Sequence, residues 1–223
     1  MVRVKICGLT SADDARLAAV CGADAVGVLV GQRHPSTDFV SSNEAAAILA
    51  ALPPFVAATL VTHEYDLAAV ADAIAVVRPN VVQIHSEMPP TDCAELRNRF
   101  GGIRIIKSYH VTGPEAVDYG RRYVDAVDGF VLDSLNPVTG QVGGTGLTHD
   151  WNFSAAIVRR YRLPVMLAGG LTPANVAAAV AVVRPFGVDV NSGVKGAIGG
   201  RKDPGKMRDF IVRAKSSGKE ALE

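Results

Sequence analysis

Cys7 and Asp133 are the residues whose types and positions best suit proton transfer. Cys7 stands between an alternating apolar run and Gly8, which predicts a thiol at the end of a short strand. A lone strand cysteine is otherwise a small buried hydrophobe. Asp133 ends a second apolar run, where it is either a turn or capping residue or an acid whose pKa is raised by desolvation. A thiolate and a carboxylic acid facing one ligand predict general base and general acid chemistry.

Lys5 supports the interpretation of Cys7 as a base. Because strand side chains alternate, Lys5 and Cys7 share one face, and the ammonium is expected to lower the pKa of the thiol from about 8.5. The other cysteines, Cys21 and Cys93, fall in helix-like segments and are expected to be packing residues. The sequence has no CxxC pair and no disulfide framework, which indicates a reducing, cytoplasmic setting.

Three glycine-containing turns, at residues 143–146, 168–170 and 191–194, predict a phosphate site. Glycine lets the backbone approach a ligand closely, and free backbone N–H groups at a helix start bind anions. The alternative is that these glycines only make tight turns. The candidate phosphate-binding residues are Gly144, Thr145, Gly146, Gly169, Gly170, Ser192 and Gly193.

These residues need a scaffold, and the chain alternates short apolar runs with helix-length segments. The expected strands are residues 2–7, 23–30, 55–61, 81–85, 103–108, 129–133, 164–167 and 188–191. The expected helices are residues 12–20, 42–51, 65–77, 92–100, 114–123, 152–161, 173–182 and 203–216. Eight such units without a break in composition predict a single-domain (β/α)8 TIM barrel over residues 1–223, with a doubly wound open sheet as the alternative.

A barrel of this kind binds its ligand at the carboxyl ends of the strands. Polar side chains gather there in the predicted layout, because most expected strands end in or are followed by one. Besides the proton-transfer pair and the glycine turns, the candidate residues of the substrate pocket are Lys5, Arg33, His34, Asp38 and His85.

Composition narrows the class of partner. The 223 residues carry a formal net charge of +1 and no basic tract, which argues against nucleic acid. The apolar runs are shorter than a membrane span, so no membrane partner is expected. The scattered histidines do not have metal-ligand spacing, so no metal site is expected. Helix faces rich in Ala and Val allow a monomer or a homodimer.

Six short motifs in order resemble the phosphoribosylanthranilate isomerase family over nearly the whole chain. They lie at residues 5–10 (KICGLT), 83–85 (QIH), 132–134 (LDS), 143–146 (GGTG, with Asp150 and Trp151), 167–171 (LAGGL) and 191–194 (NSGV, with Lys202 and Asp203).

The resemblance implies a cofactor-independent aldose–ketose isomerase of tryptophan biosynthesis that carries out an Amadori rearrangement of N-(5-phosphoribosyl)anthranilate. It implies that Asp133 is the general acid at the sugar ring oxygen and Cys7 the general base at C2. It also implies that the glycine turns hold the substrate phosphate.

Three positions depart from the family pattern. Asp38 stands where the family carries an arginine that binds the anthranilate carboxylate, Leu147 replaces a lysine, and Lys195 replaces an acidic residue. An aspartate would repel a carboxylate, so Arg33 or His34 would have to replace the missing arginine. The alternatives are a paralogous isomerase acting on another phosphorylated amino sugar or related phosphosugar, and a non-catalytic phosphosugar-binding barrel.

Overall fold

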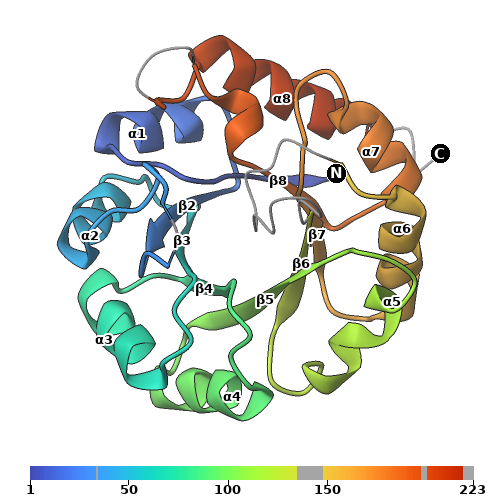
Figure 1. Ribbon diagram of the computed structural model, residues 1–223. Helices are drawn as coiled ribbons and strands as arrows, with labels where there is room; N and C mark the ends of the chain where they lie inside the picture. Colours follow the sequence, from blue (N-terminus) through green and yellow to red (C-terminus); the bar gives the residue numbers. More distant parts are fainter. Residues whose placement is uncertain (34, 135–147, 197–199, 218–223) are drawn as a thin grey trace.

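The strands of the computed structural model, which describes residues 1–33, 35–134, 148–196 and 200–217, close into one parallel barrel (Figure 1). Each strand pairs with the next along the chain, and β1 pairs with β8 to complete the ring. The strands are β1 (Arg3–Ile6), β2 (Ala25–Val30), β3 (Ala57–Thr62), β4 (Val81–Ile84), β5 (Arg104–His110), β6 (Gly129–Asp133), β7 (Val165–Leu167) and β8 (Gly187–Val190).

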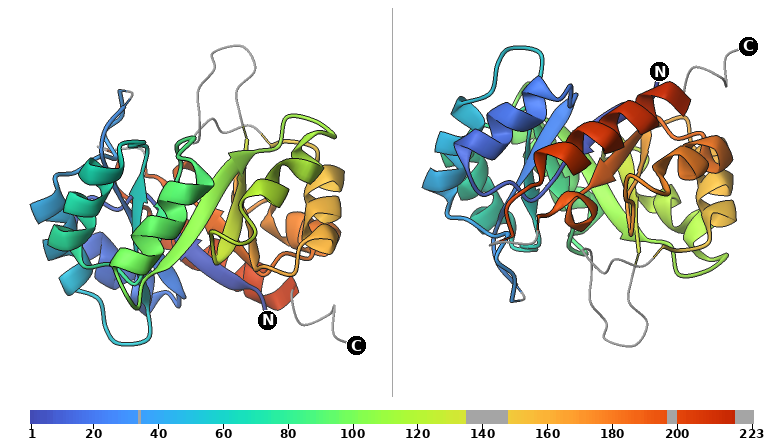
Figure 2. Two further views of the ribbon diagram at one scale, coloured as in Figure 1. Left: turned by 90° about the horizontal axis from the view of Figure 1, so that it is seen from below. Right: turned by 90° about the horizontal axis from the view of Figure 1, so that it is seen from above.

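Helices surround the barrel in chain order, as the view along its axis shows (Figure 1). They are α1 (Ala12–Val20), α2 (Ser42–Ala50), α3 (Leu67–Val77), α4 (Pro90–Arg99), α5 (Ala116–Tyr119), α6 (Trp151–Arg160), α7 (Val176–Val183) and α8 (Pro204–Ser217). Two short 3₁₀ helices, η1 (Gly120–Arg122) and η2 (Ser192–Val194), follow α5 and β8. In the side views, the N-terminus lies beside the end of α8, which packs against β1 (Figure 2).

The core lies between the outer face of the strands and the inner faces of the helices. Apolar strand residues such as Val4, Ile6 and Leu60 are fully buried, as expected for a parallel sheet covered by helices. Local signals fix the helix starts: Ser41 and Glu44 form a capping box at α2, and the side chain of Ser11 caps α1. The strand ends are thereby held in place around the mouth of the barrel.

The predicted (β/α)8 barrel is confirmed, and the open-sheet alternative is wrong because β1 pairs with β8. The prediction of one domain over residues 1–223 stays a prediction. Among the described residues, no helix is long and apolar enough to cross a membrane.

Two helix predictions were wrong in extent. The predicted helix 114–123 is a short α5 that tightens into η1 at Gly120, where glycine weakens helix formation. The predicted helix 173–182 begins at Val176, because residues 172–175 form a turn in which the Asn175 side chain accepts from the Thr172 N–H at 2.8 Å. The strand segments match, although Cys7, His85 and Asn191 lie just beyond their strands rather than within them.

Candidate active site

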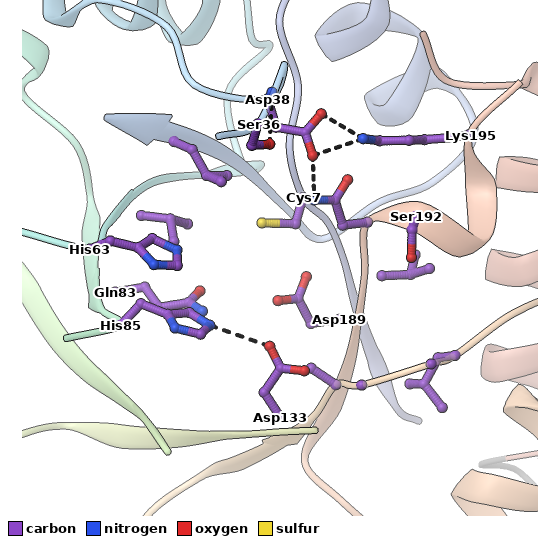
Figure 3. Close-up of a pocket in the computed structure, with 18 of the residues that line it drawn as sticks. Cys7, Ser36, Asp38, His63, Gln83, His85, Asp133, Asp189, Ser192 and Lys195 are labelled. Carbon is purple, nitrogen blue, oxygen red and sulfur yellow. Dashed lines mark hydrogen bonds and ion pairs between the residues drawn. The ribbon is translucent and has the colours of Figure 1, made fainter. Parts of the chain in front are cut away.

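A cavity opens at the carboxyl ends of the strands, and it brings Cys7, Asp38, His85 and Asp133 together (Figure 3). Its wall also contains residues of the last two turns, namely Gly169, Gly170 and Ser192. The barrel therefore gathers side chains that lie more than 180 residues apart in the sequence around one space.

The thiol of Cys7 is buried but faces the cavity (Figure 3). Its backbone N–H donates to the Val190 carbonyl at 2.8 Å, which ties the residue to β8. On its other side lies Gly27 of β2, where a Cβ atom would come within 2.9 Å of Sγ. The absence of a side chain at position 27 gives the thiol its space.

The predicted lowering of the thiol pKa by Lys5 was wrong in its net result. Burial raises the pKa of Cys7 above its ordinary value, and the opposing effects of Lys5 and Lys202 do not cancel it. Lys5 does share the face of Cys7, but its ammonium forms a buried ion pair with Asp189 at 2.8 Å. Burial acts to lower the pKa of Lys5, yet its interactions with Asp189 and Cys7 together outweigh burial and the pKa is raised.

Asp189 of β8 is a site residue that sequence reasoning missed. Its carboxylate points into the cavity between Cys7 and Asp133 (Figure 3). One oxygen is bonded to Lys5, whereas Oδ1 is buried without a hydrogen-bond partner in the described structure. The available signal was an ionisable residue inside the apolar run of residues 187–190, since a buried strand carboxylate needs a partner.

Asp133 lies across the cavity from Cys7, at the end of β6. One carboxylate oxygen is 3.3 Å from His85 Nε2, and the other accepts the Ser134 backbone N–H at 2.8 Å. Burial acts to raise the pKa of Asp133, but the bonds from His85 and Ser134 outweigh it and the pKa is lowered. The sequence-based expectation of a raised pKa was therefore wrong, because these hydrogen bonds stabilise the ionised carboxylate.

The imidazole rings of His63 and His85 line the cavity, and that of His110 lies beside His85. His63 and His85 stack with ring centroids 4.4 Å apart, and His110 lies 5.6 Å from His85. Burial lowers the pKa of His110 to about 4, so this ring is neutral near pH 7. Within the described ranges, no group of His, Cys, Asp and Glu side chains is arranged to hold a metal ion.

The turns after β7 and β8 require glycine. Gly169 has φ +82°, and a Cβ atom there would lie 2.7 Å from the Ser134 nitrogen. At Gly193, a Cβ atom would lie 1.9 Å from the Leu171 carbonyl oxygen. Gly170 and Ser192 line the cavity beside them. The third predicted turn, with Gly144, Thr145, Gly146 and the neighbouring Leu147, lies outside the described residues.

The loop after β2 does not supply the cation expected from it. Arg33 pairs with Glu64 and stacks on the Tyr65 ring, at an exposed position away from the cavity wall. His34 lies outside the described residues. Asp38, by contrast, is buried, and its carboxylate accepts from Lys195 and Asn191 (Figure 3).

Comparison with known proteins identifies one family. The model described as N-(5'phosphoribosyl)anthranilate (PRA) isomerase matches residues 4–213. N-(5'-phosphoribosyl)anthranilate isomerase 2 of Methanosarcina mazei is 41% identical over 215 residues, which cover 96% of this chain and 95% of that protein. The isomerase of Halobacterium salinarum is 42% identical over 217 residues, with 96% of each chain covered.

Solved structures agree in fold. Phosphoribosyl anthranilate isomerase from Thermotoga maritima has a TM-score of 0.84 and 36% identity, and the match covers 97% of this chain and 100% of that one. A phosphoribosyl anthranilate isomerase in complex with reduced 1-(o-carboxyphenylamino)-1-deoxyribulose 5-phosphate has a TM-score of 0.82 and 35% identity, with the same coverage.

Proposed function

The chain belongs to the N-(5'-phosphoribosyl)anthranilate isomerase family, and from that premise we propose that Cys7 and Asp133 perform the two proton transfers of its reaction. The reaction is an intramolecular aldose–ketose isomerisation in tryptophan biosynthesis. The observation that carries the proposal is that Cys7, directly after β1, and Asp133, at the end of β6, face one cavity bounded by glycine turns.

Asp133 acts first, as the general acid. It donates a proton to the ribose ring oxygen while the bond from C1' to that oxygen breaks. The lone pair of the anthranilate nitrogen forms the C1'=N double bond, so the nitrogen accepts the charge and the ring opens to an iminium ion. Asp133 lies at a rigid strand end, which supports accurate positioning of this transfer.

Cys7 then acts as the general base at C2'. Its thiolate removes the C2' proton, and the electrons of that bond form C1'=C2' and neutralise the iminium nitrogen. The resulting enolamine becomes the ketone when C1' gains a proton and the C2' hydroxyl loses one. Atoms and electrons balance within the substrate, as an isomerisation requires.

The protonation states of the free protein differ from those that these roles need. The raised pKa of Cys7 favours the thiol and the lowered pKa of Asp133 favours the carboxylate, so one proton must pass from Cys7 to Asp133. Lys5 and Lys202 stabilise the thiolate that results. Bound substrate covers Asp133 and excludes water, which favours the neutral acid.

The turns after β7 and β8 hold the substrate phosphate in this proposal. Gly169, Gly170 and Ser192 line the end of the cavity where a phosphate is bound in barrels of this class, and Gly193 directly follows Ser192 in the same turn. Gly144, Thr145 and Gly146 complete the set as an expectation from sequence. A cytoplasmic setting is proposed as well, on the free thiols of Cys7, Cys21 and Cys93.

The N-terminal face of the barrel supports a homodimer. The Thermotoga maritima relative is described as dimeric. In this chain, Phe55 is fully exposed beside a cavity of about 530 Å³ whose wall includes Ile106, Met166 and the half-exposed Phe186. An exposed aromatic ring next to an apolar cavity suits a two-fold interface in which each copy inserts Phe55 into the other.

Light scattering on the purified protein tests this assembly. The wild type is expected at twice the chain mass, and Phe55→Ser at the chain mass. Tyr65→Ser removes an exposed ring outside this cavity and is expected to stay dimeric. A monomeric wild type, or a Phe55→Ser variant that stays dimeric, would contradict the proposed interface.

The activity itself is tested directly. Purified protein is expected to convert N-(5'-phosphoribosyl)anthranilate without added metal or cofactor, and the gene is expected to restore growth of a tryptophan auxotroph that lacks this step. Absence of turnover in a folded sample would contradict the proposed chemistry.

A further inference from the structure

We infer that Lys195 receives the carboxylate of the anthranilate substrate and that Asp38 is its positioning residue. The inference rests on the family activity, because that substrate carries an anionic carboxylate at the end opposite its phosphate. It reverses the expectation from sequence that Asp38 would repel the ligand. The structure shows that the charge of Asp38 is already neutralised by a partner 157 residues away.

Lys195 is the one lysine or arginine among the described residues that line the cavity. The other nearby cations have partners elsewhere. Lys5 is fully buried against Asp189, and Lys202 is buried with its ammonium on Asn191. Arg33 pairs outward with Glu64. An incoming carboxylate therefore has Lys195 as its cationic contact within the described part of the cavity.

The geometry leaves Lys195 able to bind a second carboxylate. Its Nζ lies 2.6 Å and 2.8 Å from the two oxygens of Asp38. An ammonium has three N–H donors, so one remains when each oxygen of Asp38 receives one. The side chain is 24% exposed whereas that of Asp38 is 8% exposed, so the accessible side of the pair is the ammonium.

A chain of hydrogen bonds fixes the orientation of Asp38. Lys202 donates to the Asn191 side-chain oxygen at 2.7 Å, which leaves the amide nitrogen to donate to Asp38 at 2.9 Å. Because Lys202 requires an acceptor, the Asn191 amide has one favourable orientation. Asp38 is thereby held as an acceptor for Lys195, and the ammonium is held at the cavity wall.

The pair also lies on the appropriate side of the catalytic residues. In Figure 3, Cys7 lies between the Asp38–Lys195 pair and Asp133. A substrate that presents its sugar to Cys7 and Asp133 can therefore extend its aromatic carboxylate toward Lys195. Phe39 and His63, whose rings meet edge to face at 5.4 Å, lie on the same side of the barrel as the loop that carries Asp38.

Comparing a substrate that has the carboxylate with one that lacks it distinguishes a carboxylate contact of Lys195 from a general structural role. Lys195→Met is expected to raise KM for N-(5'-phosphoribosyl)anthranilate about 10–100-fold, the range of a lost charged hydrogen bond, with kcat changed much less. With N-(5'-phosphoribosyl)aniline, which lacks the carboxylate, the same variant is expected to match the wild type within about 2-fold. Lys195→Arg should retain most of the discrimination between the two substrates.

Lys215→Met is the matched control, because Lys215 lies on α8 and bonds to Gly22 and Asp24 away from the cavity. It is expected to change neither KM. Asp38→Asn should raise KM about 3–10-fold for the anthranilate substrate alone, since a charged pair that orients Lys195 is lost, and Asp38→Glu should recover part of it. The inference would be overturned if Lys195→Met raised KM equally for both substrates, or if it left KM for N-(5'-phosphoribosyl)anthranilate unchanged. Loss of activity on both substrates in the wild type would instead contradict the proposed function.

Discussion

Removing the charge of Asp189 should lower the pKa of Cys7. Asp189 acts on the thiol in two ways: its negative charge raises the pKa of Cys7 directly, and its ion pair with Lys5 offsets part of the positive charge that favours the thiolate. In Asp189→Asn both effects disappear. Lys5 is then a buried cation without its carboxylate, and the Cys7 thiolate is the anion available to neutralise it.

The structure sets the size of the effect. At 2.8 Å, the gross attraction between Lys5 and Asp189 is about 6 kcal/mol for an effective dielectric constant of about 20. Removing one partner of a buried pair costs about 3–5 kcal/mol of stability. Pairing of Lys5 with the thiolate should recover part of that loss, and the pKa of Cys7 should fall by roughly 1–3 pH units, the usual effect of a nearby charge.

The pH dependence of stability should weaken or reverse in the same variant, according to where the Cys7 pKa then lies relative to the unfolded value. In the wild type, the raised pKa of Cys7 contributes stability below about pH 8.5, the unfolded value, and this contribution is lost as the pH rises. In Asp189→Asn, a Cys7 pKa below the unfolded value would instead make the contribution of the thiol grow as the pH rises through the folded pKa.

Alkylation by iodoacetamide measures the thiolate directly. Cys21 and Cys93 are the other two cysteines of the chain. In a variant that carries Cys21→Ala and Cys93→Ala, the alkylation rate as a function of pH therefore gives the pKa of Cys7 alone. Asp24→Asn serves as the control, because Asp24 pairs with Arg3 and Lys215 away from the thiol. An unchanged or higher Cys7 pKa in a folded Asp189→Asn variant would refute the coupling through Lys5.

Three further predictions concern residues around the thiol and the acid. Lys202→Met should raise the pKa of Cys7, because Lys202 favours the thiolate, and should move the falling limb of kcat/KM, where Cys7 and Asp133 lose their one shared proton, to higher pH; a limb that stays in place would contradict this. Gly27→Ala should lower kcat at least about 10-fold with little change in KM, because its Cβ would lie 2.9 Å from Sγ, and steady-state kinetics would show it. His85→Asn should raise the pKa of Asp133, because a hydrogen bond that favours the carboxylate is weakened; carboxyl titration by NMR would detect the shift, and an unchanged pKa would contradict it.

The sequence predicted the barrel well because its signals are local. Buried parallel strands are apolar along their length, and a helix cap such as Ser41 depends on only a few adjacent residues. Once the strands were assigned, the barrel rule placed Cys7, His85 and Asp133 at one mouth. The sequence did not anticipate the extent of α5 and α7, because turns and 3₁₀ segments depend on contacts with neighbouring helices.

The electrostatics of the site were less predictable because they depend on distant partners. Lys5 was assigned to Cys7 by strand alternation, yet β1 pairs with β8, and the register Lys5↔Asp189 gives the ammonium another partner. Asp38 was interpreted alone as a repulsive charge, whereas Lys195 approaches it from the loop after β8. In both cases the sequence identified one charged residue of the pair. Its partner lies more than 150 positions away, and no local sequence pattern links the two.

Single-turnover conversion of N-(5'-phosphoribosyl)anthranilate by Cys7→Ser and Asp133→Asn tests the central claim most directly. Both substitutions nearly preserve the shape of the side chain. The Kd for reduced 1-(o-carboxyphenylamino)-1-deoxyribulose 5-phosphate, the ligand bound in the related isomerase structure, should therefore stay within about 3-fold of the wild-type value. The rate of conversion should fall at least about 100-fold in each variant, the lower range for loss of a general acid or base. Conversion at near wild-type rate in either variant, with analogue binding intact, would contradict the assignment of Cys7 and Asp133 as base and acid.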